Sequence, residues 1–569
     1  MDFEKLLVRI KSGNSVKSSE LLPYLCMEKS EDRSYTNFRL AEAYSEIGNL
    51  QQAKIFISRA WMLSGFSSDI LALYTKIHSE LNDIESIREA YKRLGMVEAS
   101  KDNIAGALKY FNLWQYAYAH HHKLDKYDYD FDILERIERM AEPWRFREYP
   151  CSEPFNNRKI RLAYLTYGMA QLNSVIVKIN LMLAKYHDKN RFEIAFFVPE
   201  PKFLLYGLNW HQARKNIKLL KGYNCDVVLA PDLAGKEKRL LAVASQIYHY
   251  RPDVLITSAL LAEMEHYFIA SLHPSPVIIG LLQGPPQQFS APTIDWSISW
   301  SKHPLIDAPC DSSLVHIGLD LPDRNSIKPY TKKEVSIPDN SRILISAGRY
   351  VKFQNRDFWK AIINILSRYP DLYYVVVGPS KEQFIFLDEM LTPELSERIR
   401  LLGWRDDCLN IFCLADIVID TYPSGGGHVL VDAMALGIPF VSFENNYMQK
   451  FDQTDWSVAD EFVSIPELMI NRGDFEQFQY VVSKLIDDKE YRGKMGQLCK
   501  EQIYLSMGSP EKGVRAFEEH LLKAIDKKGI NKKHFLKTKH FNKSRKNLMS
   551  TVGNLSIKTV LKLFTNKHN

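Results

Sequence analysis

The feature that most limits the possible folds is an alternation of short apolar segments and amphipathic segments between residues 158 and 443. The apolar segments are rich in Val, Ile and Leu and end in turn residues, which is typical of buried strands. The first series comprises Ile160–Tyr167, Phe192–Val198, Cys225–Leu229, Pro252–Thr257 and Pro276–Leu282. The second comprises Arg342–Ala347, Tyr373–Gly378, Ile399–Leu402, Ile417–Asp420 and Pro439–Phe443. Strands that alternate with helices predict two parallel, doubly wound sheets, with a ligand cleft between the carboxyl ends of their strands.

Residues 1–145 are expected to be helical, because apolar residues recur at helical spacing and Gly and Pro are few. Two parts of this region fit the spacing of a tetratricopeptide repeat, in which small residues let paired helices approach and aromatic residues fill the gap. The residues that fit are Leu40, Ala41, Tyr44, Gly48, Ala53, Ile57 and Ala60, and then Tyr91, Leu94, Gly95, Ala107 and Phe111. Such repeats bind partners along a groove. A generic helical bundle is the alternative interpretation.

These patterns predict four regions: an all-α domain at 1–145, two α/β domains at 158–335 and 340–525, and a tail at 527–569. The tail holds 12 Lys or Arg and no Asp or Glu, so the rest of the chain has a net charge of −6 although the whole has +6. A basic tail with scattered apolar residues predicts contact with an anionic membrane surface. The alternative is a solubilising tail without order. Nucleic acid is a less favoured partner, since aromatic residues are not interleaved with the charges.

The seven cysteines are sparse and form no C-x-x-C, which favours neither a disulfide framework nor a zinc site and indicates a reducing compartment. The N-terminus has acidic residues at once and no apolar signal region, and no apolar stretch is long enough to span a membrane. We therefore expect a cytoplasmic protein, held at most peripherally at the inner face of the membrane. The consecutive His120, His121 and His122 do not share one helix face, so a metal site there is not expected.

The sharpest local motif runs from Asp420 to Pro439 and reads Asp-Thr-Tyr-Pro-Ser-Gly-Gly-Gly-His-Val-Leu-Val-Asp-Ala-Met-Ala-Leu-Gly-Ile-Pro. A strand ends, three glycines follow and a helix begins, so free N–H groups and the helix dipole favour a phosphate or diphosphate there. Asp432 lies one turn after His428 and could hold a ribose hydroxyl. The motif is neither a dinucleotide fingerprint nor a Walker A loop. A glycine-rich turn that only permits tight packing is the alternative.

This motif resembles the donor-site signature of GT-B glycosyltransferases. With Ser346-Ala-Gly-Arg-Tyr-Val-Lys-Phe and the run from Asp371 through Gly403-Trp404 to Asp416, the chain more narrowly resembles the O-linked N-acetylglucosamine transferase family, which includes bacterial cytoplasmic N-glycosyltransferases. The resemblance covers about 158–520 and implies a GT-B fold of two Rossmann-like domains after TPR-like helices, with 158–335 on the acceptor side and 340–525 binding the nucleotide sugar. It further implies a hexosyl- or N-acetylhexosaminyltransferase that moves a UDP-linked sugar to a protein with inversion and without a metal or other cofactor.

Carried over by position, the resemblance implies that Lys352 touches uridine or phosphate, that Gly425, Gly426, Gly427 and His428 line the diphosphate, and that Asp432 binds ribose. Gln287 and Gln288 would contact sugar hydroxyls. The alternatives are a solvated surface lysine for Lys352, a helix-capping histidine for His428 and ordinary surface glutamines. The chain departs from the family in having no histidine at 168–174 and Gly-Pro-Pro at 284–286, where the N-glycosyltransferase branch has Gly-His-Pro.

No general base stands out from the sequence. The weak candidates are Glu263 and His266, which follow the strand ending at Thr257, and His303. Glu263 and His266 could equally belong to a solvated helix face. Two further functions remain open: a transferase that extends lipopolysaccharide or another surface glycan at the membrane, and a non-catalytic scaffold that holds a partner protein through its repeats.

Overall fold

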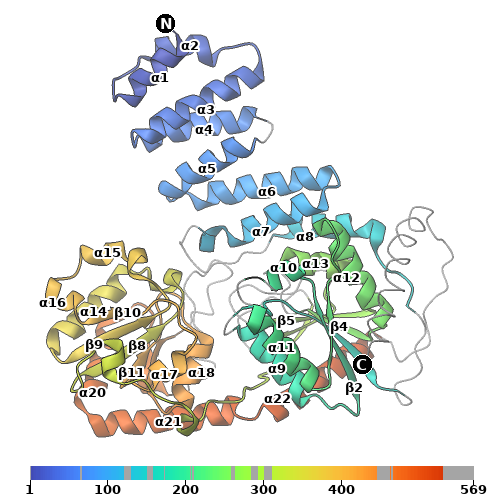
Figure 1. Cartoon of the computed structure of the whole chain (residues 1–569), viewed down its shortest axis with the longest axis vertical. Helices are drawn as coiled ribbons and strands as arrows, with labels where there is room; N and C mark the ends of the chain where they lie inside the picture. The colour runs from blue at the N-terminus through green and yellow to red at the C-terminus, as the bar shows by residue number, and fades with distance from the viewer. Residues whose placement is uncertain are drawn as a thin grey trace. The chain divides into compact units, whose positions relative to one another are not determined.

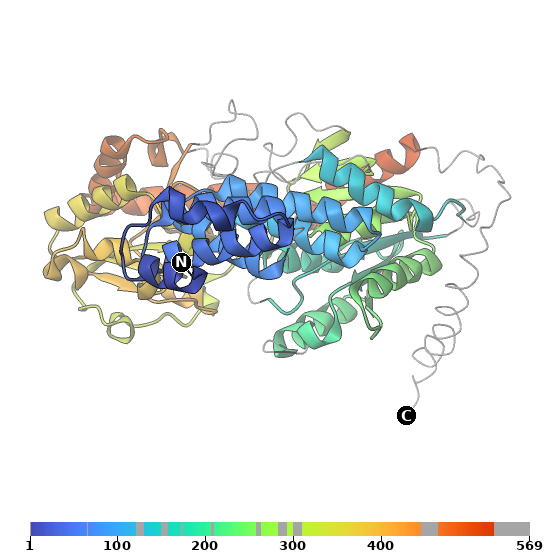
Figure 2. The same cartoon turned by 90° about the horizontal axis from the view of Figure 1, so that it is seen from above.

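The computed structural model describes residues 2–64, 67–120, 130–149, 158–171, 174–205, 207, 210–257, 263–282, 293–299, 310–444, 462 and 465–528. The chain divides into two compact units, Met1–Lys123 and Leu124–Asn569. The regular elements in the described residues of the first unit are all helices. They are α1 (Phe3–Lys11), α2 (Ser18–Leu25), α3 (Ser30–Glu46), α4 (Leu50–Leu63), α5 (Ser68–Glu80), α6 (Ile84–Ser100) and α7 (Ile104–His120), which stack in chain order (Figures 1 and 2).

Helical hairpins form where the two repeat-like segments occur. In the hairpin of α3 and α4, the rings of Tyr44 and Phe56 stack with centroids 5.5 Å apart. In the hairpin of α6 and α7, a Cβ at Gly95 would lie only 2.3 Å from the ring of Phe111, so glycine is what lets this ring approach the helix backbone. The expected pairing of a small residue with an aromatic one is therefore present, whereas the assignment to tetratricopeptide repeats stays a prediction.

The second unit begins with α8 (Phe131–Ala141), which packs against α13 (Met264–Ser271). The hydroxyl of Tyr267 donates to Glu138, and Arg145 Nε donates to the carbonyl of Ser271 at 3.0 Å. Tyr149 extends this attachment by donating to the carbonyl of His273 at 2.9 Å. The segment 131–149 is therefore attached to α13 and to the residues that directly follow this helix.

The first sheet is seven-stranded and parallel, in the order β3-β2-β1-β4-β5-β6-β7. Its strands are β1 (Ile160–Leu165), β2 (Phe192–Val198), β3 (Asp226–Leu229), β4 (Val254–Thr257), β5 (Val277–Leu282), β6 (Trp296–Ser299) and β7 (Asp311–Leu314). Its main helices are α9 (Val175–Tyr186), α11 (Trp210–Gly222), α12 (Lys236–Tyr250) and α13. The five expected strands are present. β6 and β7 were not expected, because they are short and contain Ser and Asp instead of an apolar run.

The second sheet is six-stranded and parallel, in the order β10-β9-β8-β11-β12-β13. Its strands are β8 (Arg342–Ala347), β9 (Leu372–Val377), β10 (Ile399–Leu401), β11 (Ile417–Ile419), β12 (Phe440–Phe443) and β13 (Met469–Ile470), of which only the last was not expected. Helices α14 (Arg356–Arg368), α18 (Gly427–Ala435), α20 (Phe475–Asp487) and α21 (Lys489–Met507) pack around it (Figure 1). No helix in these described ranges is long and apolar enough to cross a membrane.

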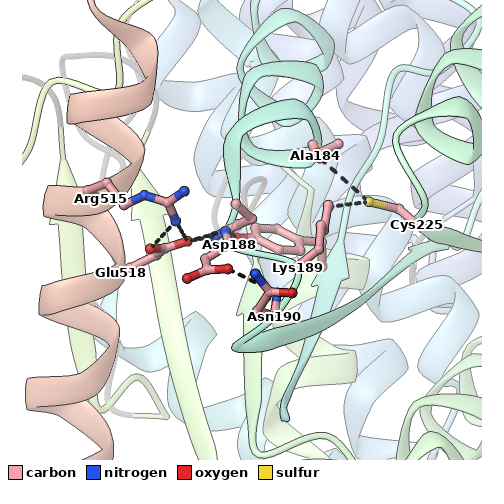
Figure 3. A network of polar contacts seen from close by, with 9 residues as sticks. Ala184, Asp188, Lys189, Asn190, Cys225, Arg515 and Glu518 are labelled. Carbon is pink, nitrogen blue, oxygen red and sulfur yellow. Dashed lines mark hydrogen bonds and ion pairs between the residues drawn. The ribbon is translucent and has the colours of Figure 1, made fainter.

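The last helix, α22 (Pro510–Lys527), returns to the first sheet and packs on α9. Its Glu518 carboxylate accepts from the backbone N–H of Asp188 at 2.8 Å and from Arg515 at 2.8 Å (Figure 3), and lies 2.8 Å from Nδ1 of the buried His187. Burial lowers the pKa of His187. For Glu518, burial acts to raise the pKa, but the hydrogen bonds to this carboxylate, first of all the one to His187, outweigh burial and lower the pKa. A Cβ at Gly513 would lie 2.2 Å from the carbonyl oxygen of Ile317, so this helix is seated closely.

Candidate active site

Hydrogen bonds to the Asp420 carboxylate hold the backbone of the loop that follows β11. One carboxylate oxygen accepts from the backbone N–H groups of Thr421 at 2.9 Å and Gly426 at 2.8 Å, and the other accepts from the Ser442 hydroxyl on β12 at 2.6 Å. Thr421 Oγ1 adds a bond to the carbonyl of Ser424 at 2.5 Å. Burial raises the pKa of Asp420, while these hydrogen bonds and the charge of Lys352 oppose that rise. The loop therefore has a fixed backbone shape just before the glycines.

Lys352 reaches this loop from the segment after β8. It lies in a short 3-10 turn, Tyr350–Phe353, and its Nζ donates to the carbonyl of Gly425 at 2.5 Å. The loops after β8 and β9 also touch, since a Cβ at Gly378 would lie 2.0 Å from the carbonyl oxygen of Gly348. Because parallel strands bring their carboxyl ends to one edge, a cation, a glycine run and a helix start converge there. Lys352 is thus not the solvated surface lysine of the alternative interpretation.

The helix α18 begins at Gly427, and its N-cap residue Gly426 supplies no side-chain cap. His428 is the second residue of this helix and not its N-cap residue. Both ring nitrogens of His428 are buried, and burial together with the charge of Lys178 lowers its pKa to about 3, so the ring is neutral. Burial raises the pKa of Asp432, one turn further along, and Lys178 opposes that rise. Lys178 lies on α9, in the domain of the first sheet. Its charge therefore affects residues of α18, which belongs to the domain of the second sheet.

This arrangement can hold an anion. A helix N-terminus with unused backbone N–H groups and a positive dipole end attracts phosphate, and a lysine at the same edge strengthens that attraction. Lys352, Gly425, Gly426, Gly427 and His428 share this edge of the sheet, and Asp432 lies one turn further along α18. The described part of the chain holds no group of three or more His, Cys, Asp or Glu that could ligate a metal ion. Independence of metal stays a prediction.

A second group of polar residues lies at the carboxyl edge of the first sheet, around Glu263 and His266. His266 is only 2% exposed, and burial lowers its pKa to about 3. Burial, followed by the charges of Glu265 and Glu200, raises the pKa of Glu263 to about 8. The interpretation as a solvated helix face is therefore wrong for His266, because α13 packs against α8 and α12. Glu263, just before α13, is half-buried.

Several sequence-predicted residues lie outside the described ranges: Gln287, Gln288 and His303, the segment 284–286, His121 and His122, and nearly all of the tail. Sequence reasoning also missed three residues. Asp420 was read only as a strand end, although an aspartate between a strand and a glycine run is a usable signal. Glu200 lies two residues after the end of β2, again near a strand end. Nothing in the sequence marks Lys178, whose place depends on how α9 meets α18.

A comparison with known families identifies part of this site. The model of the family described as glycosyl transferases group 1 matches residues 328–501. These residues form a glycosyltransferase group 1 domain. The domain contains Lys352, the three glycines, His428 and Asp432, and the prediction of a glycosyltransferase enzyme is confirmed by this match.

Two curated relatives match over shorter stretches. The lipopolysaccharide core biosynthesis glycosyltransferase LpsE of Rhizobium meliloti (strain 1021) is 23% identical over 173 residues, which are 30% of this chain and 47% of that protein. The O-antigen biosynthesis glycosyltransferase WclY of Escherichia coli is 24% identical over 144 residues, 25% of this chain and 40% of that protein. The chain thus spans about half or less of the length of these relatives.

Among solved structures, a mutant of the Thermobaculum terrenum O-GlcNAc transferase superposes with a TM-score of 0.56 at 14% identity. The superposition covers 92% of this chain and 98% of that one. It shows the fold: a helical N-terminal region followed by two parallel-sheet, Rossmann-like domains in the GT-B arrangement. The predicted fold class is confirmed.

Proposed function

We propose that the protein transfers a sugar from a nucleoside diphosphate sugar, UDP-linked, to an acceptor. The observation that carries this proposal is the contact of Lys352 with Gly425 at the uncapped start of α18. A diphosphate placed there would replace the Gly425 carbonyl as the partner of Lys352 and accept from the first N–H groups of α18. In this proposal Asp432, on the same helix, accepts hydrogen bonds from ribose hydroxyls, and both an ionised and a neutral carboxyl can do so.

The chemistry required of this site is stabilisation of a leaving group. When the bond between the anomeric carbon and the diphosphate breaks, negative charge grows on the phosphate oxygens. Lys352 and the α18 dipole stabilise that charge without moving, which lowers the barrier to transfer. A neutral His428 adds no charge but can donate or accept one hydrogen bond. No step in this scheme uses a metal ion or another cofactor.

For the acceptor, we put a protein first and a surface glycan second. The protein acceptor is favoured by the likeness in fold to an O-GlcNAc transferase, which extends through the helical N-terminal region as well as the two α/β domains. The surface glycan is favoured by the two curated relatives, whose names assign them to lipopolysaccharide core and O-antigen synthesis. The basic tail would then hold a cytoplasmic enzyme against an anionic membrane. A non-catalytic scaffold fits poorly with a complete donor edge.

The membrane proposal has a direct test. Truncation after Lys528 removes the tail and leaves α22 whole. Sedimentation with vesicles of phosphatidylglycerol should carry the full chain down and leave the truncated chain in solution. Equal sedimentation of both chains would remove the role proposed for the tail, without touching the donor site.

Calorimetric titration with UDP tests the donor site. Lys352→Ala should weaken UDP binding about 10- to 100-fold, because a hydrogen bond from a charged group contributes roughly 1.5–3 kcal/mol. Asp432→Ala should also weaken it. The matched control is Lys360→Ala, which removes an exposed lysine that pairs with Asp357 on α14 in the same domain. Equal UDP affinity for Lys352→Ala and the control would contradict the proposal.

A further inference from the structure

Four residues of the first sheet's domain form what we call the switch-point cluster: Glu200, Thr257, Glu263 and His266. Glu200 follows β2, Thr257 ends β4, and Glu263 and His266 begin α13 after β4. β1 lies between β2 and β4, and the strand order reverses at this point, from β3-β2-β1 to β4-β5. Leu165 at the end of β1 is in register with both Phe197 and Thr257, so the three strands end at one level. Crevices at such reversals are where α/β sheets bind ligands.

The cluster is held in place from the neighbouring loop. One carboxylate oxygen of Glu200 accepts from the backbone N–H of Gly168 at 2.6 Å, in the turn after β1. Gly168 has φ +75°, which an L side chain rarely adopts. The rings of Tyr167 and His266 meet edge to face with centroids 5.6 Å apart. The ends of β1 and β2 and the start of α13 are therefore held together by these contacts.

Three polar atoms of the cluster are buried yet have no hydrogen-bond partner among the described residues. They are the second carboxylate oxygen of Glu200, the hydroxyl of the fully buried Thr257, and Nδ1 of His266. Buried polar atoms are paired in most folded proteins, so three unsatisfied atoms at one sheet edge point to a polar ligand that supplies the missing partners. While Glu200 is ionised, its second carboxylate oxygen can accept a hydrogen bond from the ligand but cannot donate one. The Thr257 hydroxyl can donate or accept.

Charge around the cluster is only partly compensated. Lys236 on α12 pairs with Glu265 at 2.5 Å, and Arg239 on the same helix is also near Glu265. No such cation pairs with Glu200 or Glu263 in the described ranges. Burial raises the pKa of Glu200 to about 7, and burial with the neighbouring carboxylates raises the pKa of Glu263 to about 8. Two carboxyls with pKa values near neutrality suit proton transfer.

We propose that Glu263 is the general base of the transfer, that Glu200 positions and tunes it, and that the acceptor presents a hydroxyl group to the switch-point cluster. This inference rests on the proposed function. The acceptor oxygen forms a bond to the anomeric carbon of the sugar, and the bond from that carbon to the diphosphate breaks with its electron pair left on the leaving group. The acceptor proton moves to the Glu263 carboxylate, which later returns it to water. Attack assisted by a base opposite the leaving group inverts the anomeric configuration.

The roles of the two glutamates follow from their contacts. Glu200 is fixed through its bond to Gly168, so it is the positioning residue. Glu263 is the N-cap residue of α13, its carboxyl makes no side-chain cap hydrogen bond, and the residue is half-buried, so part of it remains exposed. Burial, followed by the charges of Glu265 and Glu200, raises the pKa of Glu263 to about 8, above the value of about 7 for Glu200, so Glu263 is the more basic of the two.

The test uses water as the acceptor, since slow hydrolysis of a nucleotide sugar needs the same proton transfer. The purified wild-type chain is first incubated with UDP-glucose, UDP-galactose, UDP-N-acetylglucosamine and UDP-N-acetylgalactosamine. The donor that is hydrolysed fastest is then used to compare the release of UDP by the variants. Glu263→Gln should lower the rate at least 100-fold and leave the calorimetric affinity for UDP within twofold. The matched control is Glu193→Gln, which removes a half-exposed glutamate on β2 at the opposite edge of the same sheet.

The pH profile separates a base from a structural residue. In the wild-type chain the rate should fall about tenfold per pH unit below about pH 8, the pKa of Glu263. Glu200→Gln should move that fall to lower pH, because it removes a negative neighbour of Glu263. A wild-type rate that stays flat down to pH 5.5, or a Glu263→Gln rate within threefold of wild type, would overturn the inference. If the wild-type chain binds no UDP, the proposed function itself fails, which is a different result from a normal affinity with an unchanged rate.

Discussion

Asp420 offers the sharpest test of how the donor loop is built. Its carboxylate accepts from Thr421, Gly426 and Ser442, and the residue is only 2% exposed. Asp420→Ala leaves two backbone N–H groups buried without a partner, each costing about 1–3 kcal/mol. We therefore expect a loss of about 3–5 kcal/mol, which corresponds to roughly 10 °C in the melting temperature of a domain of this size.

Asp420→Asn is the matched variant, because its amide oxygen can accept from both N–H groups while its NH₂ donates to the Ser442 hydroxyl. Only the charge assistance is lost, so the expected cost is about 1 kcal/mol. The assay is thermal unfolding followed by calorimetry, with UDP titration on each folded variant. The Ala variant should bind UDP at least tenfold more weakly and the Asn variant nearly normally. If Asp420→Ala melts within 2 °C of wild type and binds UDP equally well, the loop does not depend on this carboxylate.

Two further predictions concern other parts of the chain. His187 has a lowered pKa in the folded state, whereas in the unfolded chain it titrates at its ordinary pKa of about 6.5. The unfolded chain therefore binds more protons below this pH, and the free energy of unfolding should fall as the pH drops from 7 to 5.5. A melting temperature independent of pH in this window, or the same pH dependence in His187→Gln, would contradict this. Gly95→Ala should destabilise the first unit by about 1–3 kcal/mol, since the new methyl meets the Phe111 ring, whereas Gly222→Ala meets nothing and should not destabilise. Urea unfolding of the two variants decides this, and equal midpoints would refute it.

Most of the strands that the sequence predicts are buried on both faces, so their apolar runs are nearly continuous. β2 was predicted to the residue, and β8 likewise, because turn residues follow each run. Strands β6, β7 and β13 were not predicted, because they are short or polar. Each joins the sheet by pairing with a neighbouring strand. Local pattern carries no information about such pairing.

The donor edge was predictable because its residues are close in sequence or carry a family resemblance. The glycine run and Asp432 share one motif, and Lys352 was found through the resemblance. The contact of Lys352 with Gly425 spans 73 positions and depends on β8 and β11 being neighbours. Glu200 and Lys178 were missed for the same reason, since only the assembled sheet order and the approach of α9 to α18 give them partners.

The central claim is that this chain transfers a sugar through the edge formed by Lys352, Gly425–Gly427 and Asp432. The most direct measurement is UDP release from the four UDP sugars by purified wild-type protein beside Lys352→Ala. We predict release with at least one sugar by the wild-type chain and a loss of at least tenfold in the variant. No release and no UDP binding by the wild-type chain, or equal release by both proteins, would contradict it.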